Sequence, residues 1–305
     1  MPDSDPPRRR PQPDAMHDPV VLPTRRAGGL ARLTAALSVI AALALAGCAS
    51  TPVAPAATAA PAAARATAPK SAPKSALWVG NSFFYYNDGM HGHVGQLLAQ
   101  ARPGEQGYRS ASATIRGAGL NWHDVEALFK PAGVGPYPFD AQTTVLSDNV
   151  DRPFDVVIMM DCSRCPLQPR LAPVFRGYAA RHSATVRRHG AEPVFFMSWA
   201  YADRPEMTEP LAAAYVRAGA DIHARVVPAG LAFARSIAAR PDLNLYVADK
   251  RHPSLMGTYL AACTVLGSVY GISPVGNAYT AGLPADAAAQ LQSVAWQTVQ
   301  GFRQP

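Results

Sequence analysis

The sequence of 305 residues predicts an α/β fold of three layers, in which helices cover both faces of a mainly parallel central sheet. Three observations predict it. Short apolar runs alternate with longer helical patterns along the chain. Two of those runs, at 154–160 and 193–199, are almost wholly apolar, as parallel strands buried on both faces are. The part from residue 75 to residue 305 is long enough for one core in a single α/β domain.

Alternation of this kind favours right-handed crossovers between neighbouring strands. Strands are expected at 76–79, 108–115, 154–160 and 193–199, at an edge near 226–227, and at 245–247. Helices are expected at 92–101, 121–129, 171–189, 209–225, 231–239, 255–270 and 285–302. Residues 130–149 are rich in Gly, Pro and polar side chains and are expected to form a loop. Ser254 is expected to be the N-cap of the helix that follows it.

Residues 1–47 have the layout of a bacterial secretory signal, in which arginines precede an uncharged apolar run at 33–47. That run is shorter than the roughly 20 residues that a transmembrane helix needs. It ends in Leu-Ala-Gly before Cys48, which resembles a lipobox and implies that Cys48 becomes the lipidated first residue. Met16 is an alternative start. The other interpretations are an uncleaved membrane anchor and a plain secretory signal in which Cys48 is incidental.

Residues 48–74 consist largely of Ala, Pro, Thr and Ser, and we expect a disordered tether between the membrane and the domain at 75–305. Ala49 follows the lipidated position, which by resemblance to lipoprotein sorting signals favours the outer membrane, facing the periplasm or the cell surface.

The formal net charge is +7, but basic residues are scattered except at 181–188. That cluster is typical of a solvated helix face, so no nucleic-acid partner is expected.

Cys162 and Cys165 are spaced C-x-x-C, and in an oxidising envelope compartment they could form a small disulfide. A thioredoxin-like redox site is the alternative, since it needs this spacing at a helix start after a strand. A zinc site would need two more suitably spaced ligands, and none is evident. Because those ligands are missing, no metal site is predicted. The remaining cysteine, Cys263, falls in an expected helix.

Two distant stretches carry residues suited to nucleophilic catalysis. Gly80 and Ser82 follow the first expected strand, at the strand end where open α/β sheets place reactive groups. A serine hydroxyl becomes a good nucleophile when an imidazole accepts its proton and a carboxylate orients that imidazole. Asp249 and His252 are three residues apart, a spacing that a tight turn can use to bring both side chains to one side. Either stretch alone is also ordinary turn chemistry.

Taken together, these stretches resemble the SGNH hydrolases, a superfamily that includes the GDSL esterases and lipases. The resemblance rests on GNSFFYYN at 80–87, on a glycine turn with Trp and His at 115–123, and on HPSLMGTYLAA at 252–262. It implies a flavodoxin-like fold without a metal or organic cofactor. It also implies Ser82 as nucleophile, His252 as base, Asp249 as the orienting acid, and the backbone N–H groups of Ser82 and Gly117 in the oxyanion hole.

The chain departs from the superfamily after the third expected strand. An oxyanion-hole asparagine is usual there, whereas this chain has Asp161, Cys162 and Ser163. Asn81 or Ser163 could supply the missing donor. His123 is a candidate second base, although a structural or substrate-lining role is favoured. The aromatic residues at 83–86, and Trp199, could line an acyl or sugar pocket or belong to the core.

The sequence therefore predicts a lipid-anchored serine ester hydrolase of the cell envelope, acting through an acyl-enzyme on carboxylic esters such as acetylated glycans or lipid esters. The alternative is a catalytically silent envelope lipoprotein that binds glycan in the same cleft, with the altered third block marking lost activity.

Overall fold

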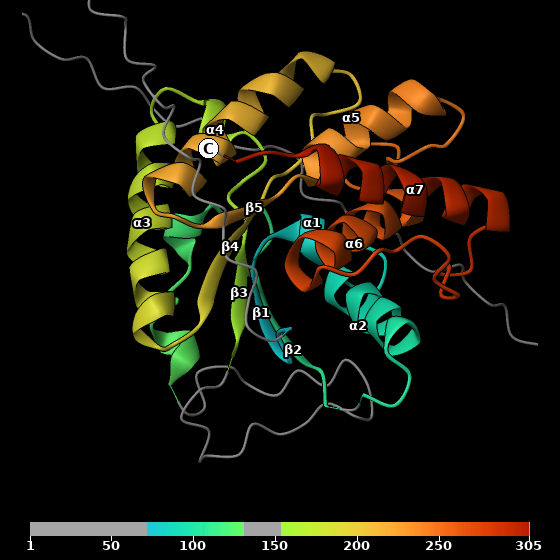
Figure 1. Cartoon of the computed structure of the whole chain (residues 1–305). Helices are drawn as coiled ribbons and strands as arrows, with labels where there is room; N and C mark the ends of the chain where they lie inside the picture. Colours follow the sequence, from blue (N-terminus) through green and yellow to red (C-terminus); the bar gives the residue numbers. More distant parts are fainter. Residues whose placement is uncertain (1–71, 106, 131–153, 305) are drawn as a thin grey trace, which may run out of the picture. The chain divides into compact units, whose positions relative to one another are not determined.

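The computed structural model describes residues 72–105, 107–130 and 154–304 (Figure 1). The expected signal peptide, the lipidation site Cys48 and nearly all of the expected tether lie outside the described residues. Nearly all of the expected loop at 130–149 does too. Within the described part of the chain, no helix is both long enough and apolar enough to cross a membrane.

The described residues form one parallel sheet, whose strands are β1 (Ser75–Gly80), β2 (Arg109–Thr114), β3 (Val156–Met159), β4 (Glu192–Phe196) and β5 (Arg225–Val227). Their order across the sheet is β2-β1-β3-β4-β5, which is the flavodoxin-like order. The chain steps from β1 to β2 in one direction and builds β3, β4 and β5 in the other. The order thus reverses between β1 and β3, where ligand crevices form in open α/β sheets. The predicted fold class is confirmed.

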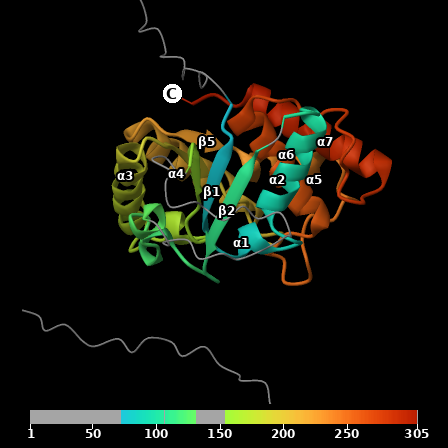
Figure 2. The same cartoon turned by 90° about the horizontal axis from the view of Figure 1, so that it is seen from below.

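Helices cover both faces of this sheet (Figures 1 and 2). On one face lie α2 (Met90–Ala101) and α6 (Leu255–Tyr270), with α5 (Ala229–Ala239) and α7 (Ala285–Gly301) packed on α6. On the other face lie α3 (Ala172–Arg188) and α4 (Thr208–Asp221). The helix α6 packs against the sheet and against α2, α5 and α7 at once. It is therefore buried over almost its whole length.

The first strand and the turn after it are anchored in the core. Every residue of β1 is buried, and the Trp78 ring meets the edge of the Phe84 ring at 5.1 Å between centroids. Phe84 in turn meets Phe196 at 5.0 Å. A Cβ at Gly80 would come within 2.9 Å of the Phe84 ring. The glycine therefore allows the chain to fold back on the strand just before Ser82.

Two sequence-based expectations are wrong. The helix expected at 121–129 is replaced by two 3-10 turns, η1 (Leu120–Trp122) and η2 (Ala127–Phe129). The backbone is extended at His123 between them, where the ring is buried. The strand expected at 245–247 is an isolated antiparallel bridge between Tyr246 and Pro253, because the chain must reverse between these two residues.

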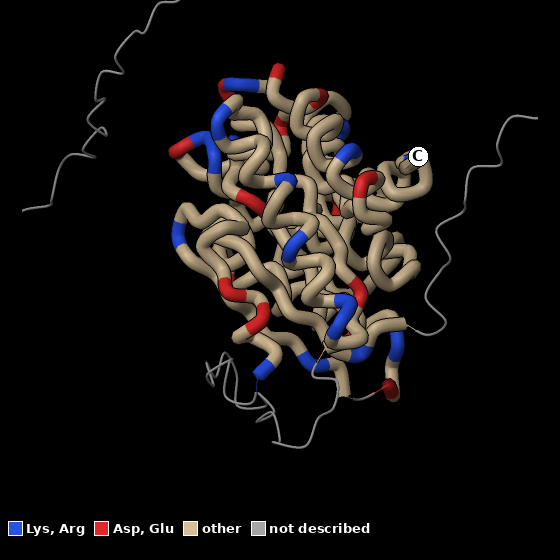
Figure 3. The backbone as a smooth tube through the Cα atoms, turned by 90° about the vertical axis from the view of Figure 1, so that its left-hand side faces the viewer, with Lys and Arg blue, Asp and Glu red and all other residues tan. Residues whose placement is uncertain are grey.

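The other expected elements are present with shifted ends, and Ser254 caps α6 by accepting a hydrogen bond from the Gly257 N–H at 3.3 Å. The basic cluster at 181–188 lies on α3, where Arg181, Arg187 and Arg188 are exposed and His182 is buried. Over the face seen in Figure 3, Lys and Arg are interspersed with Asp and Glu.

Candidate active site

Ser82 lies at the carboxyl end of β1 and is the first residue of the short helix α1 (Ser82–Tyr85). Asn81 precedes it in extended conformation and caps the helix, because its Oδ1 accepts a hydrogen bond from the Phe83 N–H at 3.2 Å. The first N–H groups of a helix have no partner within the helix. The backbone N–H of Ser82 thus stands beside its own hydroxyl without an intrahelical acceptor.

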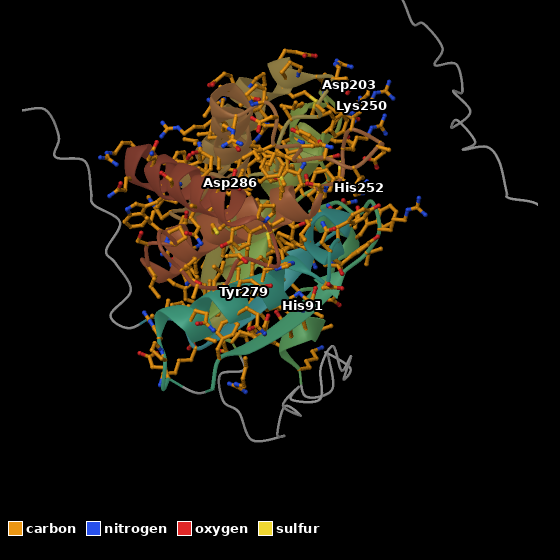
Figure 4. All side chains as sticks on the ribbon, turned by 90° about the vertical axis from the view of Figure 1, so that its right-hand side faces the viewer. His91, Asp203, Lys250, His252, Tyr279 and Asp286 are labelled. Carbon is orange, nitrogen blue, oxygen red and sulfur yellow. A yellow bond between two sulfur atoms is a disulfide. The ribbon has the colours of Figure 1, made fainter. Side chains whose placement is uncertain are left out.

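The structure brings Ser82, His252 and Asp249 into one hydrogen-bonded series. Ser82 Oγ lies 2.8 Å from His252 Nε2, and His252 Nδ1 hydrogen-bonds Asp249 Oδ2. An ionised carboxylate can only accept, so Nδ1 carries the proton and Nε2 presents its lone pair to the serine hydroxyl. The hydrogen-bonded series from the serine hydroxyl through the imidazole to the carboxylate is the geometry that activates a serine nucleophile. Figure 4 shows His252 at the edge of the molecule, near Lys250.

The turn from Asp249 to His252 holds the carboxylate in place. Lys250 has a φ of 64°, in the left-handed region, which lets the chain double back within three residues. Asp249 Oδ1 accepts hydrogen bonds from the N–H groups of Arg251 and His252, both at 2.9 Å. Partial burial opposes ionisation, but the hydrogen bonds from the His252 ring and from these two N–H groups outweigh it and lower the pKa of Asp249. Asp249 is therefore an anion at neutral pH, as an orienting acid must be.

Aromatic rings support the loop that carries His252. Trp199 is stacked between Phe83 and Phe233, with centroid distances of 4.6 and 4.2 Å, and its Nε1–H donates to the Arg251 carbonyl at 3.0 Å. Trp199 is fully buried, so it belongs to the core and is not a pocket wall.

The aromatic run at 83–86 divides in the same way. Phe83 and Phe84 are buried in the core. Tyr85 is 39% exposed and Tyr86 is half-buried, so only these two reach the surface beside Ser82.

The turn after β2 lies against the end of β1, because the Ile115 N–H donates to the Gly80 carbonyl at 3.1 Å. A hydrogen bond from the Ala118 N–H to the Ile115 carbonyl at 3.1 Å closes this turn, and Gly117 within it has a φ of 71° that favours glycine. Among the described residues, none accepts a hydrogen bond from the Gly117 N–H. Two backbone donors, those of Gly117 and Ser82, are thus available at adjoining strand ends.

Asn81 does not supply a side-chain donor to this site, contrary to expectation. Its Nδ2 donates to the Ala118 carbonyl at 3.0 Å and to the Asp161 carbonyl at 3.1 Å, which uses both amide hydrogens. The asparagine instead ties together three strand ends. Ser163, the other candidate, forms a hydrogen bond between its hydroxyl and that of Tyr201 at 2.7 Å.

Asp161 occupies the end of β3, where the superfamily asparagine is expected. It is 2% exposed, and its Oδ1 accepts a hydrogen bond from the Leu120 N–H at 2.8 Å. Burial raises its pKa, and the N–H groups of Leu120 and Cys162 offset this only in part. A Cβ at Gly119 would come within 2.6 Å of the same oxygen. Asp161 therefore buttresses the turn that carries Gly117, a role that the sequence did not reveal.

His123 is buried beneath the same turn. Its burial lowers its pKa to about 4, although a hydrogen bond to the Gly80 backbone acts in the opposite direction. Its Nε2 has no hydrogen-bond partner among the described residues. Neighbouring His182 donates from Nε2 to the Leu120 carbonyl at 2.9 Å. Both imidazoles support the backbone, which agrees with a structural role for His123.

Cys162 and Cys165 are joined by a disulfide just after Asp161, and Cys263 is buried in α6. Within the described ranges, no three His, Cys, Asp or Glu side chains lie together so that they could hold a metal ion. A hollow lined by Lys74, Asp155 and other residues lies at the amino ends of the strands. It is at the opposite edge of the sheet from Ser82 and has no part in this site.

Among solved structures, the chain is similar to a DUF4886 family protein from Bacteroides uniformis, with a TM-score of 0.53 and 15% identity over 74% of this chain and 95% of that one. The two proteins share a fold. A proposed SGNH hydrolase from Slackia heliotrinireducens matches with a TM-score of 0.48 and 23% identity, over 64% of this chain and 97% of that one. A catalytic mutant of an acetylxylan esterase from Geobacillus stearothermophilus matches with a TM-score of 0.42 and 15% identity, over 65% and 95%.

Neither a comparison with models of protein families nor a search of curated proteins finds a match. At 15% identity, the similarity to the Bacteroides uniformis protein shows the fold alone, and the roles of individual residues rest on the geometry of the site.

Proposed function

We propose that the protein is a serine ester hydrolase of the SGNH type. The observation that carries the proposal is the hydrogen-bonded series from Ser82 Oγ through the His252 ring to Asp249. These residues come from opposite ends of the domain and meet at the carboxyl edge of the sheet. Their order and their tautomer are those required for proton removal from the serine.

In the proposed reaction, Ser82 Oγ attacks the ester carbonyl while His252 Nε2 takes its proton. Asp249 stabilises the imidazolium that forms. The N–H groups of Ser82 and Gly117 donate to the oxyanion. Collapse of this intermediate expels the alcohol, which receives its proton from His252, and leaves an acyl-Ser82. A water molecule deprotonated by His252 then releases the acid.

Asp161, just after β3, determines the catalytic rate that we expect. Asp161 is turned to the Leu120 N–H, so the proposed oxyanion hole has two backbone donors and lacks the usual side-chain amide. Loss of one such donor typically costs about 10²- to 10³-fold in kcat. We therefore expect turnover to be slower than that of an enzyme with the third donor, with the nucleophile itself unimpaired.

The proposed substrates are short-chain carboxylic esters of the cell envelope, such as acetylated glycans or lipid esters. The small residues around Gly117 suit a short acyl group. The lipobox-like segment before Cys48 and the Ala/Pro-rich tether support anchoring to a membrane, most simply the outer membrane. In this proposal, the tether at 48–74 holds the hydrolase domain away from the lipid surface.

Hydrolysis of p-nitrophenyl acetate by the purified protein and by Ser82→Ala tests the activity, and a panel of esters with longer acyl chains tests the substrate class. The proposal predicts hydrolysis that is lost in Ser82→Ala and is fastest with the shortest acyl groups. The absence of hydrolysis from the wild type, together with binding of acetylated glycan, would instead favour the silent glycan-binding lipoprotein.

A further inference from the structure

The segment just after the nucleophile helix has an unusual backbone. Asn87, Asp88 and Gly89 have φ values of 54°, 64° and 81°, three consecutive residues in the left-handed region. That region costs an ordinary L-residue about 1–2 kcal/mol and is tolerated best by Gly, Asn and Asp. Such a turn persists only where surrounding contacts hold it, so its contacts indicate its purpose.

The Asn87 side chain reaches the loop that carries His252. Its Nδ2 donates to the Pro253 carbonyl at 3.0 Å and to Thr258 Oγ1 at 2.7 Å. Pro253 directly follows His252, and Thr258 lies in the first turns of α6. One amide group thus fixes the exit of the histidine loop to the segment that carries Ser82.

The neighbouring Tyr86 side chain contacts His252 itself. The two rings are stacked, with centroids 4.3 Å apart and planes inclined by 8°. Phe83 meets the same imidazole edge-on, with centroids 5.4 Å apart. These two rings restrict rotation of the imidazole. It remains in the orientation in which Nε2 faces Ser82 and Nδ1 faces Asp249.

A buried histidine on α2 is hydrogen-bonded to the backbone of this turn. His93 on α2 is 6% exposed, and both of its ring nitrogens are hydrogen-bonded. Nε2 lies 2.7 Å from the Asn87 carbonyl, which can only accept, so Nε2 carries the proton. Nδ1 therefore accepts from the Tyr279 hydroxyl at 2.8 Å. The Asn87 backbone is thereby anchored to the helical layer rather than to solvent.

We propose that Tyr86 and Asn87 are positioning residues that hold the His252 ring against Ser82. Tyr86 fixes the plane of the His252 ring, and Asn87 fixes the distance between the loop that carries His252 and the segment that carries Ser82. The proposal rests on the serine hydrolase function, but it concerns the placement of His252, which can be measured without a substrate. Neither side chain takes part in bond making.

The test uses two pairs of variants and a remote control. Asn87→Gly removes the amide without straining a positive φ, and Asn87→Asp keeps the size but replaces the donor by an acceptor. Tyr86→Phe keeps the stacked ring, and Tyr86→Leu removes it. Gln304→Glu is the control, because Gln304 also bridges two backbone groups, Val226 N–H and Ala224 C=O, at the amino edge of the sheet.

Two readouts are needed: kcat and KM for p-nitrophenyl acetate, and the far-downfield proton NMR signal of the His252 Nδ1–H bonded to Asp249. Displacement of a catalytic group by about 1 Å can cost 10²-fold in rate. We therefore expect kcat to fall roughly 10- to 100-fold in Asn87→Gly, Asn87→Asp and Tyr86→Leu, with KM changed less than about 3-fold. The downfield signal should broaden or vanish in the same three variants. Tyr86→Phe and Gln304→Glu should retain both rate and signal.

A downfield signal as sharp in Asn87→Gly and Tyr86→Leu as in the wild type would overturn the proposal. Its absence from the wild type would overturn the placement of His252 and this proposal with it. If the wild type cleaves no ester, the proposed function fails, yet the signal still decides whether Tyr86 and Asn87 position the ring.

Discussion

Acidification should destabilise the fold through His123, the buried imidazole beneath the turn that carries Gly117. In the unfolded chain this side chain titrates near its ordinary pKa of 6.5, whereas burial lowers its pKa to about 4 in the folded protein. Between these two values the unfolded chain binds one more proton than the folded protein. The free energy of unfolding should therefore fall as the pH falls through this window.

The size of this effect follows from the gap between the two pKa values. At about 1.4 kcal/mol per pH unit, the whole gap corresponds to roughly 3.5 kcal/mol. Most of it should already be lost at pH 4.5. A loss of this size is a large fraction of the stability of a typical domain, which is about 5–15 kcal/mol.

The assay is urea unfolding of the wild type and of His123→Asn at several pH values between 7 and 4.5. Asparagine can still donate to the Gly80 carbonyl but does not titrate in this range, so it serves as the matched control. Other titrating groups, including His182, contribute to both proteins. We expect the wild type to lose roughly 2–3 kcal/mol more than His123→Asn between pH 7 and pH 4.5. Equal losses in the two proteins would refute the reasoning.

Three further substitutions probe the site. Asp249→Asn should lower kcat/KM about 10³- to 10⁴-fold, because an amide cannot hold the required tautomer of His252; steady-state kinetics showing less than a tenfold loss would contradict this role. Asn81→Ala should lower the free energy of unfolding by about 2–4 kcal/mol, since it removes a helix cap and two buried hydrogen bonds; urea midpoints unchanged from the wild type would count against it. Gly119→Ala should cost about 1–3 kcal/mol and reduce kcat, because its Cβ would displace Asp161; a variant with wild-type stability and kcat would disprove the buttress.

Local patterns in the sequence predicted the fold class, whereas the roles of Ser82, His252 and Asp249 were predicted from the resemblance of their two stretches to the SGNH hydrolases. Apolar runs that end in polar residues mark parallel strands and the edge at which they end. Asp249 and His252 are near neighbours in the chain, and Ser82 follows the first strand. Topology alone then brings the two stretches to one edge of the sheet.

The role of Asn81 was mispredicted because hydrogen-bond partners distant in sequence decide it. A free asparagine beside a nucleophile looks like a donor for substrate. In the structure the carbonyls of Ala118 and Asp161 take both of its amide hydrogens. The contribution of Asp161 was missed for the same reason, since Leu120 is its partner 41 residues away.

The failed helix at 121–129 shows tertiary contacts overriding a local pattern. His123 is drawn into the interior towards Gly80, which forces extended backbone in the middle of the expected helix. Asn87 stands in the same block as Ser82, but its amide donates to the Pro253 carbonyl, a partner 166 residues away that the local sequence does not indicate.

Activation of Ser82 by His252 is tested most directly by covalent labelling with a fluorophosphonate probe. Intact mass measurement and peptide mapping would be applied to the wild type, Ser82→Ala and His252→Ala. We predict one phosphonyl group per wild-type molecule, located on Ser82. Ser82→Ala should remain unlabelled, and His252→Ala should be labelled far more slowly. A wild type that stays unlabelled, or that carries the adduct on another residue, would contradict the account.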